Sequence, residues 1–382
     1  MTKNLLPFAL TALVLASPSF AADEAAAPTV TLYGVVHLSA DLLDYTDDRG
    51  TAGNLTDDED ETNLAVSSNS SRLGIRGEKA LSDSLTLSYL AEWQIGATEE
   101  SKSGSGANAG TGAGSNNNLS RRNQWLGLKT SYGEWRIGRF DTPLKNIRGK
   151  VDLFYSDQLG ETRTITNISG IDSRWDNSVQ FDLGTGAVHG LFIYSADRGT
   201  DAIDDNDNDG LSAAVTWESG AWFVGGGYEQ RSYANTVRDS DSALDDTKAI
   251  RVAASFKFGD GSNQKVTGFF ETVDNVSGTP DRDRDVYGVG YSFKTGDNVF
   301  KAAYYVADDL SDDTDDESGA SQLSLGWDHL YGKNTVLYVT AASVSNDDES
   351  TFKVVGVGHD GEINSAAGAN NSGLSAGVRY QF

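Results

Sequence analysis

The strongest constraint on the fold of this 382-residue chain is an alternation of apolar and polar side chains with a period of two. It recurs at residues 85–95, 211–218, 250–258, 287–293 and 300–306. At the C-terminal end the apolar positions are Leu374, Ala376, Val378, Tyr380 and Phe382. Period two indicates β-strands with one apolar face. Because chain ends are ordinarily frayed and polar, this apolar last strand is predicted to be buried in an apolar environment.

The connections between these stretches are of two kinds, and the two kinds alternate along the chain. Tight turns rich in Gly, Asp, Asn and Ser are expected at residues 82–84, 131–133, 184–186, 219–220, 259–261, 295–297 and 331–333. Longer, mostly acidic connections are expected at residues 41–61, 197–210, 231–246, 274–285, 308–318 and 345–372. This order places the tight turns at one end of an antiparallel sheet and the long loops at the other.

We therefore predict an all-β fold, a transmembrane antiparallel β-barrel of about sixteen strands with short periplasmic turns and long extracellular loops. Closure into a barrel removes the sheet edges and satisfies every backbone amide and carbonyl group in a bilayer. A soluble β-sandwich or propeller also alternates, but its strands are shorter and its loops do not segregate by length. Aromatic residues near strand ends, such as Trp93, Trp217 and Tyr291, fit an interfacial girdle.

The first 21 residues are predicted to be a secretory signal peptide, which leaves residues 22–382 for the barrel. A short basic start precedes an apolar run from Leu5 to Ala16, and small residues lead to a cleavage site after Ala21. That run is too short to span a bilayer as a helix. No later stretch approaches ~20 consecutive apolar residues, which excludes an inner-membrane protein.

Composition and motif spacing argue against nucleic acid as a partner and against an enzyme. The chain has 56 acidic and 30 basic residues, whereas phosphate binding requires a basic face. There is no cysteine, and the four histidines (His37, His189, His329 and His359) lack metal-ligand spacing. Residues 205–210 begin like a calcium-binding EF-hand loop, but Thr216 occupies the position that requires Glu. We expect no cofactor and no dedicated metal site.

Five segments, in the correct order, resemble strands of the Gram-negative general porins, a family of trimeric outer-membrane barrels. They are VTLYGVV (30–36), SRLGIRGE (71–78), QWLGLKTSYGEWRIGRFDTPL (124–144), RWDNSVQF (174–181) and GVRYQF (377–382). The resemblance implies a water-filled channel for passive diffusion of ions and small hydrophilic solutes across the outer membrane. It implies contact with outer-membrane lipid and lipopolysaccharide. It also implies that Tyr380 and Phe382 belong to the signal read by the outer-membrane assembly machinery.

The resemblance further implies a constriction, where the third long loop (residues 141–172) folds into the barrel and faces basic residues on the wall. The candidate loop acids are Asp141, Asp152, Asp157 and Glu161. The candidate wall residues are Arg72, Arg76, Arg122 and Arg174, of which Arg76 is assigned by parity with Arg72. A charge on the lipid face at mid-depth costs roughly 2–4 kcal/mol, so these arginines are expected to face the lumen. The adjacent Arg121 leaves the register at Arg122 open.

Selectivity depends on two opposing features. Acids in the long loops enrich cations at one mouth, whereas wall arginines favour anions. Some relatives carry a basic residue after Tyr-Gly in the first strand, where this chain has Val35. We therefore expect a weak cation preference. The alternatives are a porin specific for a sugar or an organic acid, and a barrel that is an adhesin or structural protein without a channel.

A homotrimer is also expected. Gly34 lies on the predicted outer face of the first strand and would let a neighbouring subunit approach closely. The Gly-, Ser- and Asn-rich segment 101–118 would form a latch between subunits.

Overall fold

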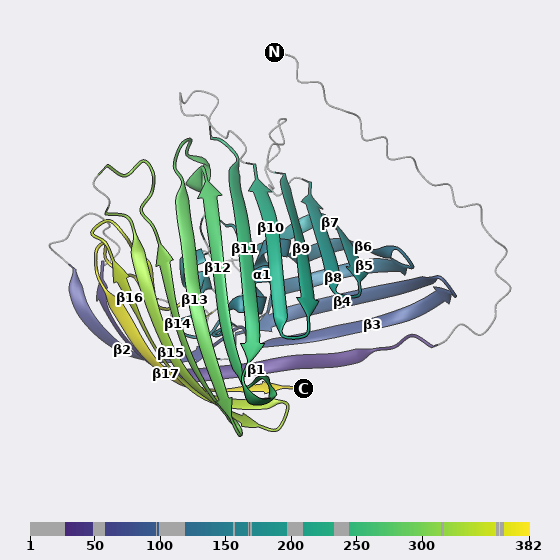
Figure 1. Cartoon of the computed structure of the whole chain (residues 1–382), viewed down its shortest axis with the longest axis horizontal. Coiled ribbons are helices and arrows are strands. Elements are labelled where there is room, and N and C mark those ends of the chain that lie inside the picture. The colour runs from purple at the N-terminus through teal and green to yellow at the C-terminus, as the bar shows by residue number, and fades with distance from the viewer. Residues whose placement is uncertain are drawn as a thin grey trace, which may run out of the picture.

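The computed structural model describes residues 27–48, 58–96, 98, 119–155, 157–166, 168, 170–196, 209–232, 244–314, 317–356, 359 and 363–382. The predicted signal peptide and the predicted latch segment lie outside these ranges. Within them, all strands belong to one antiparallel sheet (Figure 1). No helix in the described ranges is long and apolar enough to cross a membrane.

The described ranges contain seventeen strand segments. They are β1 (Thr31–Asp47), β2 (Glu59–Ser68), β3 (Arg72–Ser82), β4 (Leu85–Ile95), β5 (Leu119–Thr130), β6 (Gly133–Asp141), β7 (Arg174–Thr185), β8 (Val188–Ser195), β9 (Gly210–Ser219), β10 (Trp222–Arg231), β11 (Thr247–Phe258), β12 (Gln264–Asp274), β13 (Arg284–Thr295), β14 (Asn298–Ala307), β15 (Ala320–Tyr331), β16 (Thr335–Asn346) and β17 (Asn371–Gln381). The helices are α1 (Pro143–Val151) and α2 (Arg163–Thr166), with short 3-10 turns at Asp260–Ser262 and Val276–Gly278.

The seventeen segments make sixteen barrel strands, as predicted. β2 and β3 both pair with β1, one after the other, and only residues 69–71 separate them. They are therefore the two halves of one interrupted strand. The sheet closes because β1 also pairs with β17, from Val35 opposite Gln381 to Asp44 opposite Ser372.

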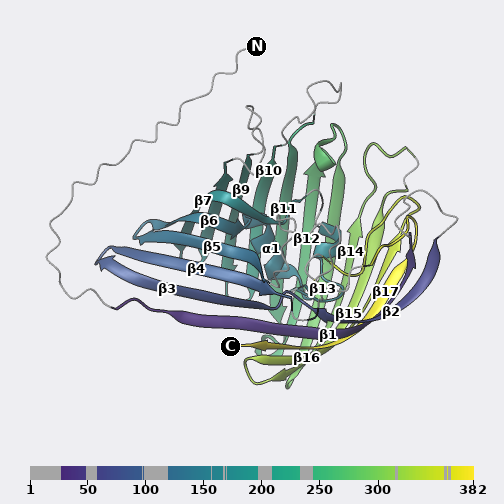
Figure 2. The same cartoon turned by 180° about the vertical axis from the view of Figure 1, so that it is seen from behind.

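The closing seam ends in a contact between Gly34 and Phe382. Their backbones exchange two hydrogen bonds of 3.0 and 3.1 Å, and both views place the C-terminus beside β1 (Figures 1 and 2). A Cβ atom on Gly34 would lie 2.5 Å from the Phe382 ring and 2.8 Å from the Arg72 carbonyl oxygen. Gly34 is thus required by a contact within one chain. The approach of another subunit, which the sequence suggested as the reason for a small residue here, stays a prediction.

All seven tight turns lie where the sequence predicts them. At five of them a glycine has a left-handed backbone, with φ of 65° at Gly186, 57° at Gly220, 63° at Gly261, 57° at Gly296 and 66° at Gly332. The first long connection is shorter than predicted. Residues 41–47 remain in β1, because they still pair with β2 and the first of them with β17.

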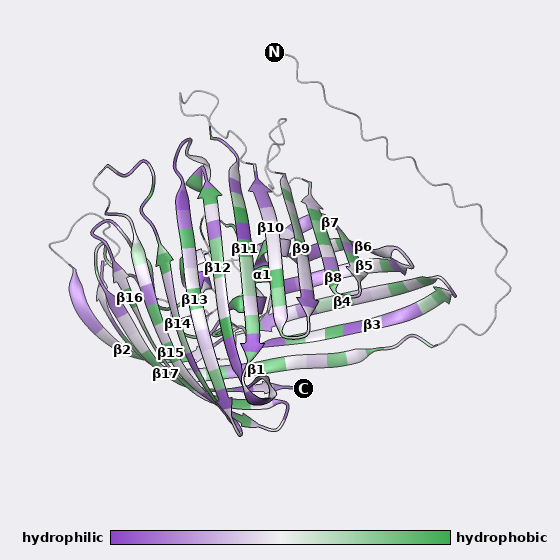
Figure 3. Cartoon of the chain, viewed as in Figure 1, coloured by the Kyte–Doolittle hydropathy of each residue, from purple (hydrophilic) through white to green (hydrophobic). Residues whose placement is uncertain are grey.

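The apolar positions of each strand lie on the outer face of the barrel. Along β17 and the adjoining terminus, Leu374, Tyr380 and Phe382 are 50%, 45% and 48% exposed, whereas the intervening Ser375 is fully buried. Figure 3 shows the same alternation of hydrophobic and hydrophilic residues along other strands. This outer face is the surface that a bilayer covers.

Residues 142–173, between β6 and β7, fold into the barrel and pack against its wall. Thr142 caps α1 by accepting a hydrogen bond from the Lys145 amide, and Pro143 begins the helix. α1 contacts β8 to β12 (Figures 1 and 2). Gly227 of β10 makes room for it, since a Cβ atom there would lie 2.9 Å from Ile147. We call residues 142–173 the inner loop.

The inner loop has an apolar core of its own against the wall. Its buried members, each at most 7% exposed, are Leu144, Ile147, Val151, Phe154, Leu159, Ile165, Ile168 and Ile171. Five of them, Leu144, Phe154, Ile165, Ile168 and Ile171, pack with wall residues of β11 to β14, including Ala249, Val273 and Ala303. Ile147 and Val151 pack with Ala214, Phe223 and Ala253, and Leu159 packs with Leu43 and Val344. Burial of this apolar surface keeps the loop inside the barrel.

Candidate functional site

Arg72 and Arg122 converge on Glu92 from the strands on either side of β4. The distance from Arg72 Nε to Glu92 Oε2 is 3.5 Å, and that from Arg122 Nε to Glu92 Oε1 is 2.6 Å. A β-bulge shifts the register of β4 against β5 between Ala91 and Trp93. It places Arg122 on the inner face, while the Arg121 side chain is 61% exposed. This resolves the register that the sequence left open.

Arg174 and Asp141, both predicted, are brought together at the ends of β7 and β6. The distance from Arg174 Nε to Asp141 Oδ1 is 2.8 Å. Lys145 of α1 lies 2.8 Å from the same oxygen, and Asn123 donates to Oδ2 over 2.8 Å. Lys145 was missed in the sequence, although it stands four residues after Asp141 at the start of a helix.

Arg76 shares the inner face with Arg72 but lies apart from this group. Its guanidinium group stacks on the Tyr33 ring, 5.0 Å from the centroid, and the side chain is exposed. Among the described residues it forms no ion pair with the four predicted acids. Its role in a constriction stays a prediction.

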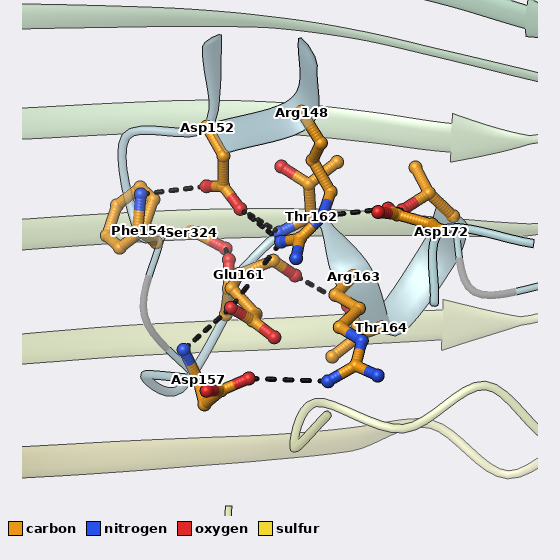
Figure 4. A network of polar contacts seen from close by, with 12 residues as sticks. Arg148, Asp152, Phe154, Asp157, Glu161, Thr162, Arg163, Thr164, Asp172 and Ser324 are labelled. Carbon is orange, nitrogen blue, oxygen red and sulfur yellow. Dashed lines mark hydrogen bonds and ion pairs between the residues drawn. The ribbon is translucent and has the colours of Figure 1, made fainter. Parts of the chain in front are cut away.

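Asp152 and Glu161 bind an arginine of the inner loop itself. Arg148 Nη1 lies 3.3 Å from Asp152 Oδ2 and 3.6 Å from Glu161 Oε2 (Figure 4). Arg148 Nε lies 2.7 Å from Asp172 Oδ2, and all four side chains are at most 3% exposed. Burial, with Asp157 nearby, raises the pKa of Glu161 to about 8. These two predicted acids therefore fold the loop on itself, and their place at the constriction stays a prediction.

Arg251, on the inner face of β11, fastens the inner loop to the wall. Arg251 Nη1 donates to the Leu144 carbonyl oxygen over 2.8 Å, and Nη2 lies 3.3 Å from Asp172 and 2.6 Å from Glu271. The side chain is 1% exposed. Arg251 was not predicted from the sequence. The side-chain alternation that assigned Arg76 would also have placed Arg251 on the inner face, because its neighbours Ile250 and Val252 are apolar and point outward.

Asp157 is a predicted acid that lies in the electrostatic field of the wall arginine Arg122. Burial opposes its charge, but Arg163, Arg122 and the Ser70 hydroxyl group together hold the pKa of Asp157 below its usual range. Arg163 Nη1 is 3.4 Å from Asp157 Oδ1 (Figure 4). Asp157 has a left-handed backbone with φ of 58°, which forms the bend at the tip of the loop. It is thus a carboxylate held between a loop arginine and a wall arginine.

The site as a whole carries more basic than acidic groups. The basic groups are Arg72, Arg122, Lys145, Arg163 and Arg174, and the acidic groups are Glu92, Asp141 and Asp157. Burial and the neighbouring Arg174 lower the pKa of Lys145 to about 7 in spite of its ion pair with Asp141. The charge of the site therefore changes close to neutral pH.

A recess of about 620 Å³ continues from this site toward the tight turns. Asp141 and Asn123 line its upper part, and Gly186 and Ala187 of the β7–β8 turn line its lower part. Polar side chains and the rings of Trp125 and Phe140 also border it. The recess thus extends from Asp141 toward the turn end of the barrel.

A sequence model of the Gram-negative porins matches residues 9–349. The chain belongs to the Gram-negative porin family. Outer membrane porin protein 32 of Delftia acidovorans is 25% identical over 396 aligned residues, with all of both chains covered. Chitoporin of Vibrio furnissii is 30% identical over 207 residues, which cover 53% of this porin and 49% of that one.

Solved porin structures share the fold. The anion-selective porin from Comamonas acidovorans superposes with a TM-score of 0.73 at 23% identity, covering 93% of this porin and 100% of that chain. The trimer form of OmpT from Vibrio cholerae gives 0.62 at 17% identity, with 93% and 100% covered. This porin is therefore an outer-membrane channel protein of a Gram-negative bacterium and not an enzyme. Its described residues contain no group of three or more His, Asp or Glu side chains that could hold a metal ion.

Proposed function

We propose that this porin lets ions and small hydrophilic solutes diffuse through a passage that narrows between the wall arginines and the tip of the inner loop. The observation that carries the proposal is Asp157, an ionised carboxylate at the loop tip in the field of Arg122. Arg72 and Arg174 extend the basic side, whereas Asp152 and Glu161 hold the loop in shape. Opposite charges across a narrow passage favour polar solutes over apolar ones.

We propose that the acidic mouth and the basic interior act on selectivity in opposite directions. Among the residues that the structure describes, the long loops carry several acidic side chains. These include Asp308, Asp309, Asp312, Asp347 and Asp348, and their negative charges enrich cations near the mouth. Screening weakens this effect, because the Debye length falls from about 10 Å at 0.1 M salt to about 3 Å at 1 M. A weak cation preference at low salt should therefore decline as salt rises. The anion selectivity named for the Comamonas porin supports an anion preference once the mouth is screened.

Reversal potentials in planar bilayers test this proposal directly. KCl gradients of equal ratio, centred near 0.1 M and near 1 M, should give a cation-favouring potential that shrinks or changes sign at the higher salt. An anion-favouring potential already at low salt would show that the arginines dominate throughout. The variant Asp157→Asn should shift both potentials toward anions, and no shift would exclude Asp157 from the constriction.

We propose that the porin is a homotrimer in the outer membrane, with lipid and lipopolysaccharide around its apolar outer face. The trimer form of OmpT from Vibrio cholerae supports this assembly, as do the exposed apolar side chains of the outer face. Tyr380 and Phe382, exposed on that surface at the closing seam, are proposed to be read by the assembly machinery. Light scattering and unheated detergent gels test the oligomer, and a monomer in both would contradict it.

A further inference from the structure

The interruption between β2 and β3 is the point where two loops, distant in sequence, meet the barrel wall. Asn69, Ser70 and Ser71 are each at most 3% exposed, and Ser70 has a left-handed backbone with φ of 50°. The Asn69 amide donates to the His37 carbonyl oxygen over 2.8 Å, which keeps the break attached to β1. The break therefore presents polar groups to the barrel interior at a fixed place.

The tip of the inner loop contacts this break from one side. The Ser70 hydroxyl group hydrogen-bonds the Asp157 carboxylate. The Asp157 amide in turn donates to Glu161 Oε2 over 2.8 Å, so the tip is a closed turn. The position of Asp157 relative to Arg122 thus depends on how this turn is seated.

A segment of the last long connection, between β16 and β17, contacts the break from the other side. His359 forms an isolated β-bridge with Asn69, and its Nε2 lies 3.3 Å from Asp41 Oδ2. The His359 and Asp41 side chains are both fully buried. Asp41 belongs to the pairing of β1 with β17 that closes the barrel. The wall therefore holds His359 beside this closing seam.

The same segment is bonded to the inner loop. The Gly160 amide donates to the Val354 carbonyl oxygen over 3.1 Å. Val354 and Leu159 belong to one apolar cluster with Leu43 and Val344 of the wall, and all four residues are 0% exposed. Gly160 stands three residues after Asp157, so this bond restrains the turn that carries the tip.

We propose that His359 and Val354 are positioning residues for the constriction: His359 fixes the last connection to the wall at the break, and Val354 then holds the loop tip so that Asp157 faces Arg122. The inference rests on the proposed role of Asp157. A buried polar or ionic pair adds little net stability but can fix one geometry. The His359–Asp41 pair therefore matters for where the tip lies more than for whether the barrel folds.

Single-channel recording of four variants tests the proposal. His359→Ala removes the bond to Asp41, and loss of a hydrogen bond to a charged group shifts a two-state equilibrium by about 10-fold or more. Openings to a larger-conductance substate should become more frequent by that factor. Asp41→Asn keeps only a neutral amide acceptor and should reproduce part of the change from the other partner, whereas His359→Gln, which keeps an N–H donor to the charged Asp41, should resemble the parent. His329→Gln, a histidine that bonds Asn298 at the tight-turn end, is the matched control.

The outcomes separate this proposal from the proposed constriction. All variants are compared as folded, heat-modifiable barrels, and Asp41→Asn decides the matter if His359→Ala does not fold. If Asp157→Asn shifts the reversal potential while His359→Ala and Asp41→Asn leave the substates unchanged, the positioning role is overturned and the constriction stands. If His359→Ala and Asp41→Asn alter the substates but Asp157→Asn does not change the reversal potential, Asp157 does not lie at the constriction. The contact between the last connection and the inner loop would then still control the conductance. Equal substates in His329→Gln and His359→Ala would also overturn the proposal.

Discussion

Replacing Arg251 by methionine is expected to release the inner loop from the wall while leaving the barrel closed. The guanidinium group joins the Leu144 carbonyl oxygen, Asp172 and Glu271, at 2.8, 3.3 and 2.6 Å. Methionine keeps much of the apolar stem of arginine but supplies no donor. The backbone pairs of β11 with β10 and β12 do not involve this side chain.

The size of the effect follows from the burial of the partners that remain. Removing one member of a buried ion pair costs about 3–5 kcal/mol, because the other charge is left uncompensated. Asp172 keeps Arg148 Nε at 2.7 Å, so the lower end of that range applies. About 3 kcal/mol corresponds to roughly 10²-fold in the ratio of docked to released loop.

Single-channel conductance and its substates measure the released fraction, and heat-modifiability in gels measures the barrel. Arg251→Met should show frequent openings to a larger conductance with an intact folded band. Arg136→Met is the matched control, since Arg136 pairs with Glu134 and Asp182 of the wall at 2.5 and 3.0 Å and does not bind the loop. Identical records from the parent and Arg251→Met would refute the reasoning, as would equal substates in Arg136→Met.

Three further predictions concern charge, pH and closure. Arg72→Ser should raise conductance and shift the reversal potential toward cations more than Arg76→Ser does. The reason is that Arg76 stacks on Tyr33, outside the arginine group. Equal effects of the two variants would place Arg76 at the constriction. Between pH 6 and 9 the reversal potential should move toward cations, since Lys145 becomes neutral above about 7 and Glu161 becomes charged above about 8. Lys145→Met should remove the lower step, and a flat profile in the parent would contradict both assignments. On refolding in detergent, without the assembly machinery, Gly34→Ala should reduce the yield of folded barrel in unheated gels, and adding Phe382→Ala should restore part of it by removing the ring that the new methyl group meets.

The barrel could be predicted from the sequence because its signals are local. Side-chain parity assigns the two faces of a strand, and Gly, Asp and Asn mark hairpin turns, so neither requires knowledge of distant residues. Arg72 was assigned to the interior in this way. Parity could not assign Arg122, which was named by resemblance with its register left open, because the bulge between Ala91 and Trp93 shifts the alternation by one residue. A bulge has no sequence signature strong enough to locate it in advance.

The pairing inside the site could not be predicted, because it depends on non-local packing. Asp172 and Arg251 are 79 residues apart and meet only once the inner loop lies on the wall. Asp152 and Glu161 were placed opposite the wall arginines, since nothing in the sequence shows that Arg148 emerges from α1 between them. A helix inside the inner loop brings together charged residues that are distant from one another in the sequence.

The division of the inner loop into a buried side and an exposed side has a consequence for how such a pore can diversify. Phe154, Ile165 and Ile171 are 0% exposed and carry the packing, whereas Tyr155 is 40% exposed, stands two residues before Asp157 and has its ring face against Arg148. Exchanges at exposed positions usually alter stability by less than about 0.5 kcal/mol. A lineage can therefore replace Tyr155 and change what passes through the channel, while the apolar side of the loop keeps the scaffold intact.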